Sequence, residues 1–201
     1  MRSVKKLLAL FLTAGTVFCL AGCAGTGAEA PSQQEASAPA ETEAEKVLVA
    51  YFSATGNTKN AAENIAEITG GDLYEIIPAE AYTEEDLDYG NDQSRTSLEM
   101  NDPDARPEIA GEALDLEGYD VLYLGYPIWH GQAPRIMDTF AEQYDFDGMT
   151  VIPFCTSGGS GIGSSAETLE ELAGSGSWLE GQRFSSGVSE EELQEWIDSI
   201  Q

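Results

Sequence analysis

Three polar loops hold the residues whose types and spacing could do chemistry, and the first loop is the most specific. It comprises Ser53, Ala54, Thr55, Gly56, Asn57 and Thr58. Three hydroxyls, an amide side chain and a run of backbone N–H groups ahead of a helix form an anion site suited to a phosphate. The GxxxxGK[ST] spacing of a P-loop is absent, so a phosphate monoester fits better than a triphosphate. The alternative is an ordinary capped turn.

Each of the three loops follows an apolar segment typical of a buried strand. Residues 46–52, 120–126 and 150–155 are near-continuous apolar runs, and shorter strands are expected at 73–77 and 182–184. Helical spacing predicts helices from residue 58 to Gly70–Gly71, from about Pro134, from Ser164 or Ser165 to Leu172, and from near Ser189. Residues 79–118 are polar with weak periodicity, which predicts a long loop.

Five strands that alternate with helices predict an α/β fold, with a parallel sheet between two layers of helices. The three loops then follow the carboxyl ends of strands. Open α/β sheets bind their ligands at that edge, beside the point where the strand order reverses. The sequence therefore predicts one site assembled from all three loops.

The composition excludes several classes of protein. The chain has 36 acidic and 9 basic residues, a formal net charge of −27, and we expect no nucleic-acid partner because phosphate backbones attract basic surfaces. Three cysteines and one histidine exclude a zinc finger or a disulfide scaffold, and no metal site is expected. A hydrolase of the Ser-His-Asp or Cys-His type would have to use His130, the single histidine.

The first 45 residues differ in composition from the rest. Residues 1–22 combine a basic start, an apolar run and small residues, which is the pattern of a secretory signal. The Leu-Ala-Gly-Cys stretch ending at Cys23 resembles the lipobox of bacterial lipoproteins and predicts lipidation of Cys23; a plain cleaved signal is the alternative. Residues 24–45 lack aromatic, Leu, Ile, Val and Met residues, so residues 23–45 are expected to form a lipid-anchored, disordered tether. The folded domain is expected at 46–201.

Residues 46–201 resemble the flavodoxin family. Its phosphate-loop pattern, [ST]-x-T-G-x-T after the first strand, is met by Ser53, Thr55, Gly56 and Thr58. The resemblance implies a flavodoxin-like three-layer sandwich, a five-stranded sheet in the order 2-1-3-4-5, and one non-covalently bound FMN. The sequence departs from the common electron carriers of the family in its lipoprotein-like leader. Its third loop also lacks the aromatic residue that often covers the outer flavin face.

Given this resemblance, the second loop is expected to contact the flavin ring. It comprises Pro127, Ile128, Trp129, His130 and Gly131. An indole stacks favourably on a flat, electron-poor ring, so Trp129 is the expected stacking residue; a core tryptophan is the alternative. Gly131 is the candidate for the peptide that turns over when flavin N5 gains a proton, because glycine tolerates the required dihedrals. His130 is either a catalytic group or a surface residue.

The third loop is expected to approach the pyrimidine edge of the flavin. Its residues Thr156, Ser157, Gly158 and Gly159 let the backbone come close, and their N–H groups would bind the pyrimidine oxygens. The alternative is a flexible glycine loop. Neither the second nor the third loop contains a basic residue, and the acidic surface predicts that reduction to an anionic flavin is disfavoured.

These features favour an FMN protein that transfers electrons with a protein redox partner. We expect it to be a monomer, anchored by lipid at the outer face of the cytoplasmic membrane. Two alternatives stay open. A small FMN-dependent NAD(P)H or quinone reductase is favoured by His130 and the open third loop. A non-catalytic FMN-binding lipoprotein is the other.

Overall fold

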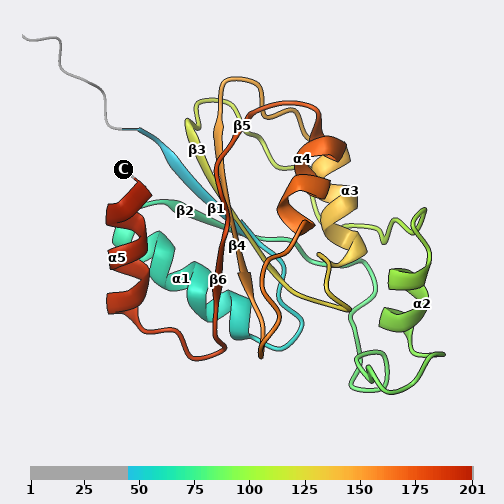
Figure 1. Ribbon diagram of the computed structural model, residues 1–201. Helices are drawn as coiled ribbons and strands as arrows, with labels where there is room; N and C mark the ends of the chain where they lie inside the picture. Colours follow the sequence, from blue (N-terminus) through green and yellow to red (C-terminus); the bar gives the residue numbers. More distant parts are fainter. Residues whose placement is uncertain (1–44, 201) are drawn as a thin grey trace, which may run out of the picture. The chain divides into compact units, whose positions relative to one another are not determined.

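The computed structural model describes residues 45–200, which form an α/β sandwich of three layers (Figure 1). The predicted signal at 1–22 and the predicted tether at 23–45 with Cys23 lie outside the described residues, apart from Glu45. The strands are β1 Val47–Tyr51, β2 Asp72–Glu75, β3 Val121–Pro127, β4 Thr150–Thr156, β5 Ser177–Trp178 and β6 Gln182–Phe184. The helices are α1 Asn57–Thr69, α2 Arg95–Asn101, α3 Arg135–Gln143, α4 Ser165–Ala173 and α5 Glu190–Ile200.

The sheet confirms the predicted fold class and strand order. Its strands pair in parallel in the order β2-β1-β3-β4-β5, and β6 also pairs with β4. The edge of the sheet beside β4 is formed by two short strands instead of the one expected at 182–184. β5 pairs with the start of β4, and β6, which is the expected strand, pairs with its end. The interruption lies beside Pro153 of β4, which has no backbone N–H to donate.

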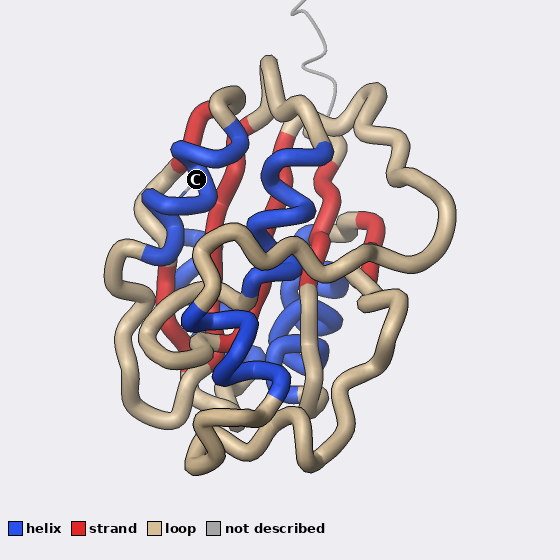
Figure 2. Tube along the Cα trace, turned by 90° about the vertical axis from the view of Figure 1, so that its right-hand side faces the viewer, coloured by secondary structure: helices blue, strands red, loops and turns tan. Residues whose placement is uncertain are grey.

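Helices cover both faces of this sheet. Helices α1 and α5 lie on one side and α3 and α4 on the other, and Figure 2 shows the second pair in front of the strands. Alternate residues of β1 enter two separate cores: Leu48 and Ala50 pack toward one, Val49 and Tyr51 toward the other. Both faces of the strand are buried, which explains why its sequence is continuously apolar rather than alternating. None of the described helices is long and apolar enough to cross a membrane.

The segment between β2 and β3 is more ordered than the sequence predicts. The expected loop at 79–118 contains α2, which begins after Ser94, whose side chain accepts a hydrogen bond from the Ser97 N–H. Two turns are too short to give a clear helical period, so the pattern could not reveal α2. Arg106 of the same segment makes two hydrogen bonds of 2.8 Å each to Glu142 of α3 and so ties it to the sandwich.

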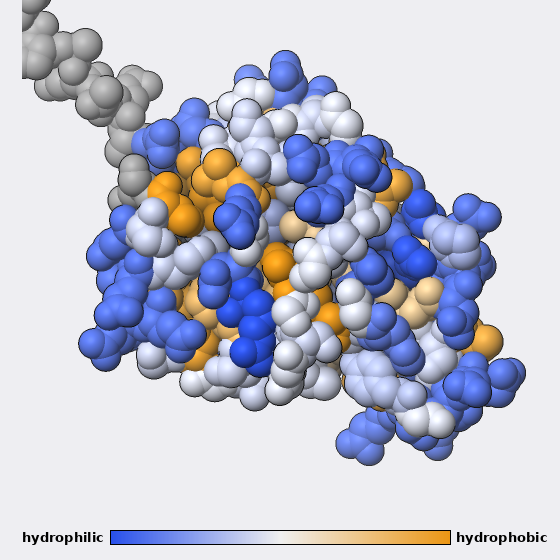
Figure 3. Space-filling model, in the orientation of Figure 1, coloured by the Kyte–Doolittle hydropathy of each residue, from blue (hydrophilic) through white to orange (hydrophobic). Residues whose placement is uncertain are grey.

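Glycine at the centre of β3 is required by packing against β4. A Cβ at Gly125 would lie 2.2 Å from the Cζ of Phe154, whose ring fills the space above the strand. The face of the molecule shown in Figure 3 is mostly hydrophilic, with hydrophobic areas between polar side chains.

Candidate functional site

The three loops meet at one cavity at the carboxyl ends of β1, β3 and β4. Its volume is about 280 Å³. Most of the predicted site residues line it, together with two that were not predicted, Tyr89 and Ser186. The predicted ones are Ser53, Ala54, Thr55, Asn57, Thr58, Pro127, Ile128, Trp129, Thr156, Ser157 and Gly158. Four others, Gly56, His130, Gly131 and Gly159, belong to the same loops but do not line the cavity.

The first loop forms an uncapped helix N-terminus. Gly56 precedes α1 in a left-handed conformation, with φ 85°, and no side chain caps the helix. Instead, the Ser53 hydroxyl accepts a hydrogen bond from the Gly56 N–H at 3.1 Å, which closes the loop. Asn57 and Thr58 begin α1 and line the cavity. Because the first N–H groups of a helix have no partner within it, this end of the cavity fits an anion.

Thr58 also joins the first loop to the third. Its side-chain oxygen lies 2.8 Å from that of Thr156 at the end of β4, and both residues are buried. This hydrogen bond links segments that are 98 residues apart in the sequence. The first and third loops are therefore joined to each other by two buried hydroxyls.

No charged residue lines the cavity in the described part of the chain. Lys59 is the nearest cation in sequence to the first loop, and it pairs with Glu75 at 3.4 Å. The anion end of the cavity thus offers neutral donors, as predicted for a phosphate monoester. The rest of the cavity wall is largely apolar, which suits a planar ring. It includes Ala54, Tyr89, Pro127 and Ile128.

The second loop is a tight turn. Trp129 and Gln132 exchange two backbone hydrogen bonds of 2.9 Å each, and between them His130 and Gly131 both have positive φ, 48° and 84°. This is the type I′ pattern of two-residue turns. Both residues are exposed at the tip of the turn, so His130 occupies the surface position that was one of its two predicted alternatives. The turning over of the Gly131 peptide stays a prediction.

Trp129 lines the cavity but is almost fully buried. Its side chain is only 2% exposed and packs edge-on with Phe52 and Tyr82, at ring-centre distances of 5.4 and 5.0 Å. Phe52 and Tyr82 pack against the indole, which favours the alternative of a core tryptophan over a stacking residue. The loop position between proline and glycine had suggested exposure. The sequence could not show that Tyr82, from the segment after β2, reaches this tryptophan.

Tyr89 is the aromatic residue of the site that the sequence analysis missed. It lies in the segment between β2 and α2, lines the cavity and is 51% exposed. Its ring centre is 5.5 Å from that of His130. Partial burial raises the pKa of the Tyr89 phenol, while a hydrogen bond with Trp129 opposes the rise. The residue therefore stays a neutral phenol at neutral pH. Its neighbours in the sequence are polar and show no periodicity, so the sequence did not indicate that Tyr89 belongs to the site.

Arg183 was also missed, because it is 26 residues from the loop that it contacts. It lies on β6, and its guanidinium donates to the carbonyl oxygen of Ser157 at 2.6 Å and to the hydroxyl of Ser157 at 3.2 Å. The third loop itself contains no basic residue, as the sequence analysis states, but in the structure Arg183 of β6 lies against it. Burial raises the pKa of the adjacent Cys155 thiol to about 12, with the Arg183 charge opposing the rise, so Cys155 is a buried, unreactive thiol.

Comparison with known proteins agrees with the fold. The sequence profile of the flavodoxin family matches residues 46–200. The chain belongs to the flavodoxin family. Flavodoxin 1 of Salmonella typhimurium is 32% identical over 108 residues, which are 52% of this chain and 45% of that protein. The match thus spans less than half the length of this curated relative.

Solved structures include closer relatives of this flavodoxin-family chain. A protein from Bacteroides eggerthii, described as a flavoprotein, is 49% identical, with a TM-score of 0.72 over 77% of this chain and 97% of that one. Another from Bacteroides uniformis is 45% identical, with a TM-score of 0.74 over 78% and 99%. A flavoprotein from Lactobacillus acidophilus in complex with FMN is 25% identical, with a TM-score of 0.56 over 77% and 99%.

Proposed function

We propose that this protein binds FMN non-covalently and transfers electrons between redox partners. The observation that carries the proposal is the uncharged cavity, which joins an uncapped helix N-terminus to an apolar wall at the carboxyl edge of a flavodoxin-type sheet. Membership of the flavodoxin family and the FMN complex of the Lactobacillus acidophilus relative support this cofactor.

Each part of the site has a role in holding this cofactor. The first loop and the start of α1 would hold the phosphate through neutral donors, and backbone N–H groups of the third loop would face the pyrimidine edge. Ile128 and Tyr89 would contact the ring and restrict the access of water. FMN supplies reversible one- and two-electron chemistry. The protein contributes binding, orientation and the local electrostatic field.

The visible absorption spectrum of the purified protein tests the cofactor. We expect a yellow protein. It should release FMN on acid precipitation, because a non-covalently bound cofactor is freed when the protein unfolds. A colourless protein that does not take up added FMN would refute the proposal.

The phosphate assignment is tested by replacing Asn57 and Thr58 together with alanine. Each lost hydrogen bond to a charged phosphate is worth about 1.5–3 kcal/mol, so FMN affinity should fall by at least tenfold. Riboflavin, which has no phosphate, is the control ligand, and its affinity should change much less. Equal losses for both flavins would show that the variant disturbs the fold rather than a phosphate contact.

A small FMN-dependent reductase is the second candidate function. It is favoured by the exposed ring of His130 beside Tyr89 at the rim of the cavity, where a second reactant could approach. Stopped-flow mixing with NADH, NADPH or a quinol distinguishes the two candidates. A carrier is reduced slowly without a partner enzyme, whereas a reductase turns over with the small molecule alone.

For location, we propose a lipid anchor at Cys23 that holds a monomeric FMN domain on the extracytoplasmic side of the membrane. The basic start, the apolar run and the Leu-Ala-Gly-Cys stretch support this proposal. Metabolic labelling with a fatty acid is the test. Label that persists after Cys23→Ser would refute the anchor.

A further inference from the structure

Arg183 is unusual among the basic residues of the described part of the chain. Of the 36 acidic and nine basic residues, 31 and six lie at or after Lys46. Five of these six basic side chains pair with carboxylates at 2.6–3.8 Å, namely those of Lys46, Lys59, Arg95, Arg106 and Arg135. Within residues 45–200, Arg183 alone has no such carboxylate partner. Its charge is therefore not neutralised locally, although acidic residues outnumber basic ones fivefold.

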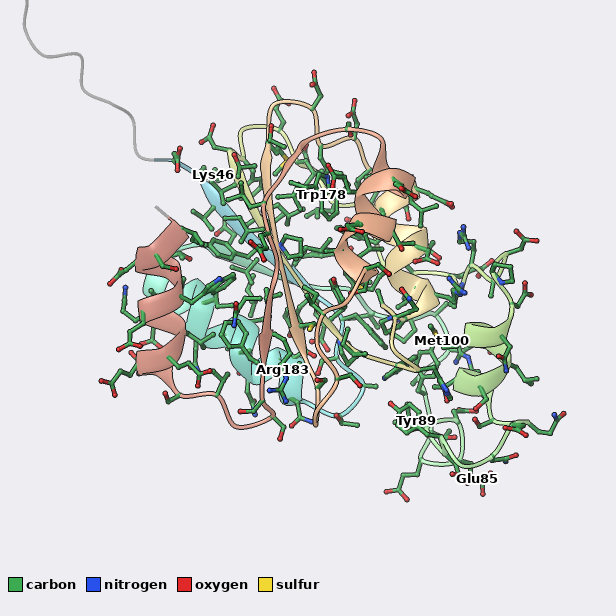
Figure 4. The ribbon with its side chains drawn as sticks, viewed as in Figure 1. Lys46, Glu85, Tyr89, Met100, Trp178 and Arg183 are labelled. Carbon is green, nitrogen blue, oxygen red and sulfur yellow. The ribbon has the colours of Figure 1, made fainter. Side chains whose placement is uncertain are left out.

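The guanidinium of Arg183 is instead used to hold the third loop. It donates to both the carbonyl and the hydroxyl oxygen of Ser157, and the Ser157 N–H donates to the Phe184 carbonyl at 3.1 Å. The Ser157 hydroxyl in turn donates to the carbonyl of Ser160. One end of the glycine-rich turn is thus fixed to β6 at three points. Figure 4 shows Arg183 near the lower ends of the strands, far from Lys46 and Trp178 at the other end of the sheet.

The same contact brings a positive charge to the cofactor cavity. Ser157 and Gly158 line the cavity, and no lining residue is charged. Among the side-chain hydrogen bonds within residues 45–200, Arg183 makes the only ones that join a basic residue to a cavity-lining residue. A guanidinium stays charged at all physiological pH values. Opposite charges also attract more strongly where the protein lowers the effective dielectric constant than in bulk water.

We propose that Arg183 is a positioning residue that holds the third loop and stabilises the anionic, fully reduced form of FMN. The inference rests on the proposed function, namely that FMN binds in this cavity. Two-electron reduction adds two electrons and one proton to FMN and leaves one additional negative charge on the ring system. The net charge of the domain disfavours that anion, and Arg183 opposes the effect from the side of the third loop. The net charge of the domain and Arg183 therefore change the midpoint potential of FMN in opposite directions, and mutation can separate the two effects.

The experiment compares Arg183→Gln, Arg183→Lys and wild type in the purified protein. FMN affinity is measured by fluorescence titration, and the midpoint potential by reductive titration with dithionite. Arg183→Gln should weaken binding of reduced FMN about tenfold more than binding of oxidised FMN, which lowers a two-electron midpoint potential by about 30 mV. Arg183→Lys keeps the charge and should lower the potential by less than half as much.

Arg106→Gln is the matched control, because it removes the same charge from a residue that pairs with Glu142 away from the cavity. Its midpoint potential should stay close to that of wild type. Equal shifts in the Arg106 and Arg183 variants would show a general effect of net charge and overturn the proposal. An unchanged potential in Arg183→Gln would overturn it as well.

The positioning role has a readout that needs no flavin. Amide hydrogen exchange at residues 158–160 of the FMN-free protein should be faster in both Arg183 variants, because lysine cannot form the two-pronged contact with Ser157. Unchanged exchange in both variants would overturn this role. Failure of the wild-type protein to bind FMN would overturn the proposed function and with it the charge role. If the wild-type protein binds FMN but the Arg183 variants change neither the midpoint potential nor the amide exchange, only this inference is overturned.

Discussion

At the scale of single residues, the site depends on which aromatic side chain offers a ring to a ligand. Trp129 and Tyr89 both line the cavity, but the indole is almost fully buried and the phenol is half exposed. A buried ring is already in contact with protein and gains little from a ligand, whereas an exposed ring loses contact with water on stacking. Tyr89 is therefore the aromatic residue with surface available to a flavin.

Replacement of Tyr89 by leucine tests this difference. An aromatic stacking contact is worth about 0.5–1.5 kcal/mol, so FMN affinity should fall by about three- to tenfold. The fluorescence of the remaining bound flavin should rise, because a stacked phenol quenches it. Leu98 is the matched control, since it is also 51% exposed and belongs to the same segment but does not line the cavity. A Leu98→Ala variant with the same loss of affinity would contradict the assignment.

At the scale of elements, the turn from Trp129 to Gln132 is determined by backbone conformation. Gly131 has φ 84°, and a Cβ there would meet no atom within 4 Å. Any cost of adding a side chain is therefore conformational rather than steric. The turn projects from the end of β3, so its shape sets where the His130 ring lies relative to the cavity.

We expect Gly131→Ala to lower the free energy of unfolding by about 1–2 kcal/mol, the cost of a left-handed conformation for a residue with a Cβ. Gly187→Ala provides the comparison, because that glycine also has open space around it but no positive φ. Urea denaturation of the FMN-free proteins measures the free energy of unfolding of both variants. If the two variants lost the same stability, the turn would not be under the conformational constraint described above.

At the scale of the whole molecule, the dominant feature is negative charge. The sequence has a formal net charge of −27, and most of its acidic residues belong to the folded part. Repulsion among surface carboxylates destabilises a compact state, and salt screens it. Both the stability of the fold and the field at the cofactor cavity should therefore depend on ionic strength.

We expect the melting temperature at pH 7 to rise by about 2–4 °C, equivalent to about 1 kcal/mol, between about 0.01 M and 1 M NaCl. The rise should largely disappear near the sequence pI of about 4.1, where the net charge is small. Differential scanning calorimetry at the two pH values is the measurement. An equal rise at both would indicate a general salting-out effect instead of charge screening.

The sequence by itself determined the α/β class, the strand order expected from the flavodoxin resemblance and the three loops that form the cavity. The class and the loops have local signals: continuous apolar runs from strands buried on both faces, and small polar residues where each strand ends. The strand order has no local signal and was implied by the family resemblance alone. The burial of Trp129, the place of Tyr89 and the contact of Arg183 with Ser157 were decided only by the tertiary structure. Each depends on a partner from a segment distant in the sequence, and local periodicity carries no information about such contacts.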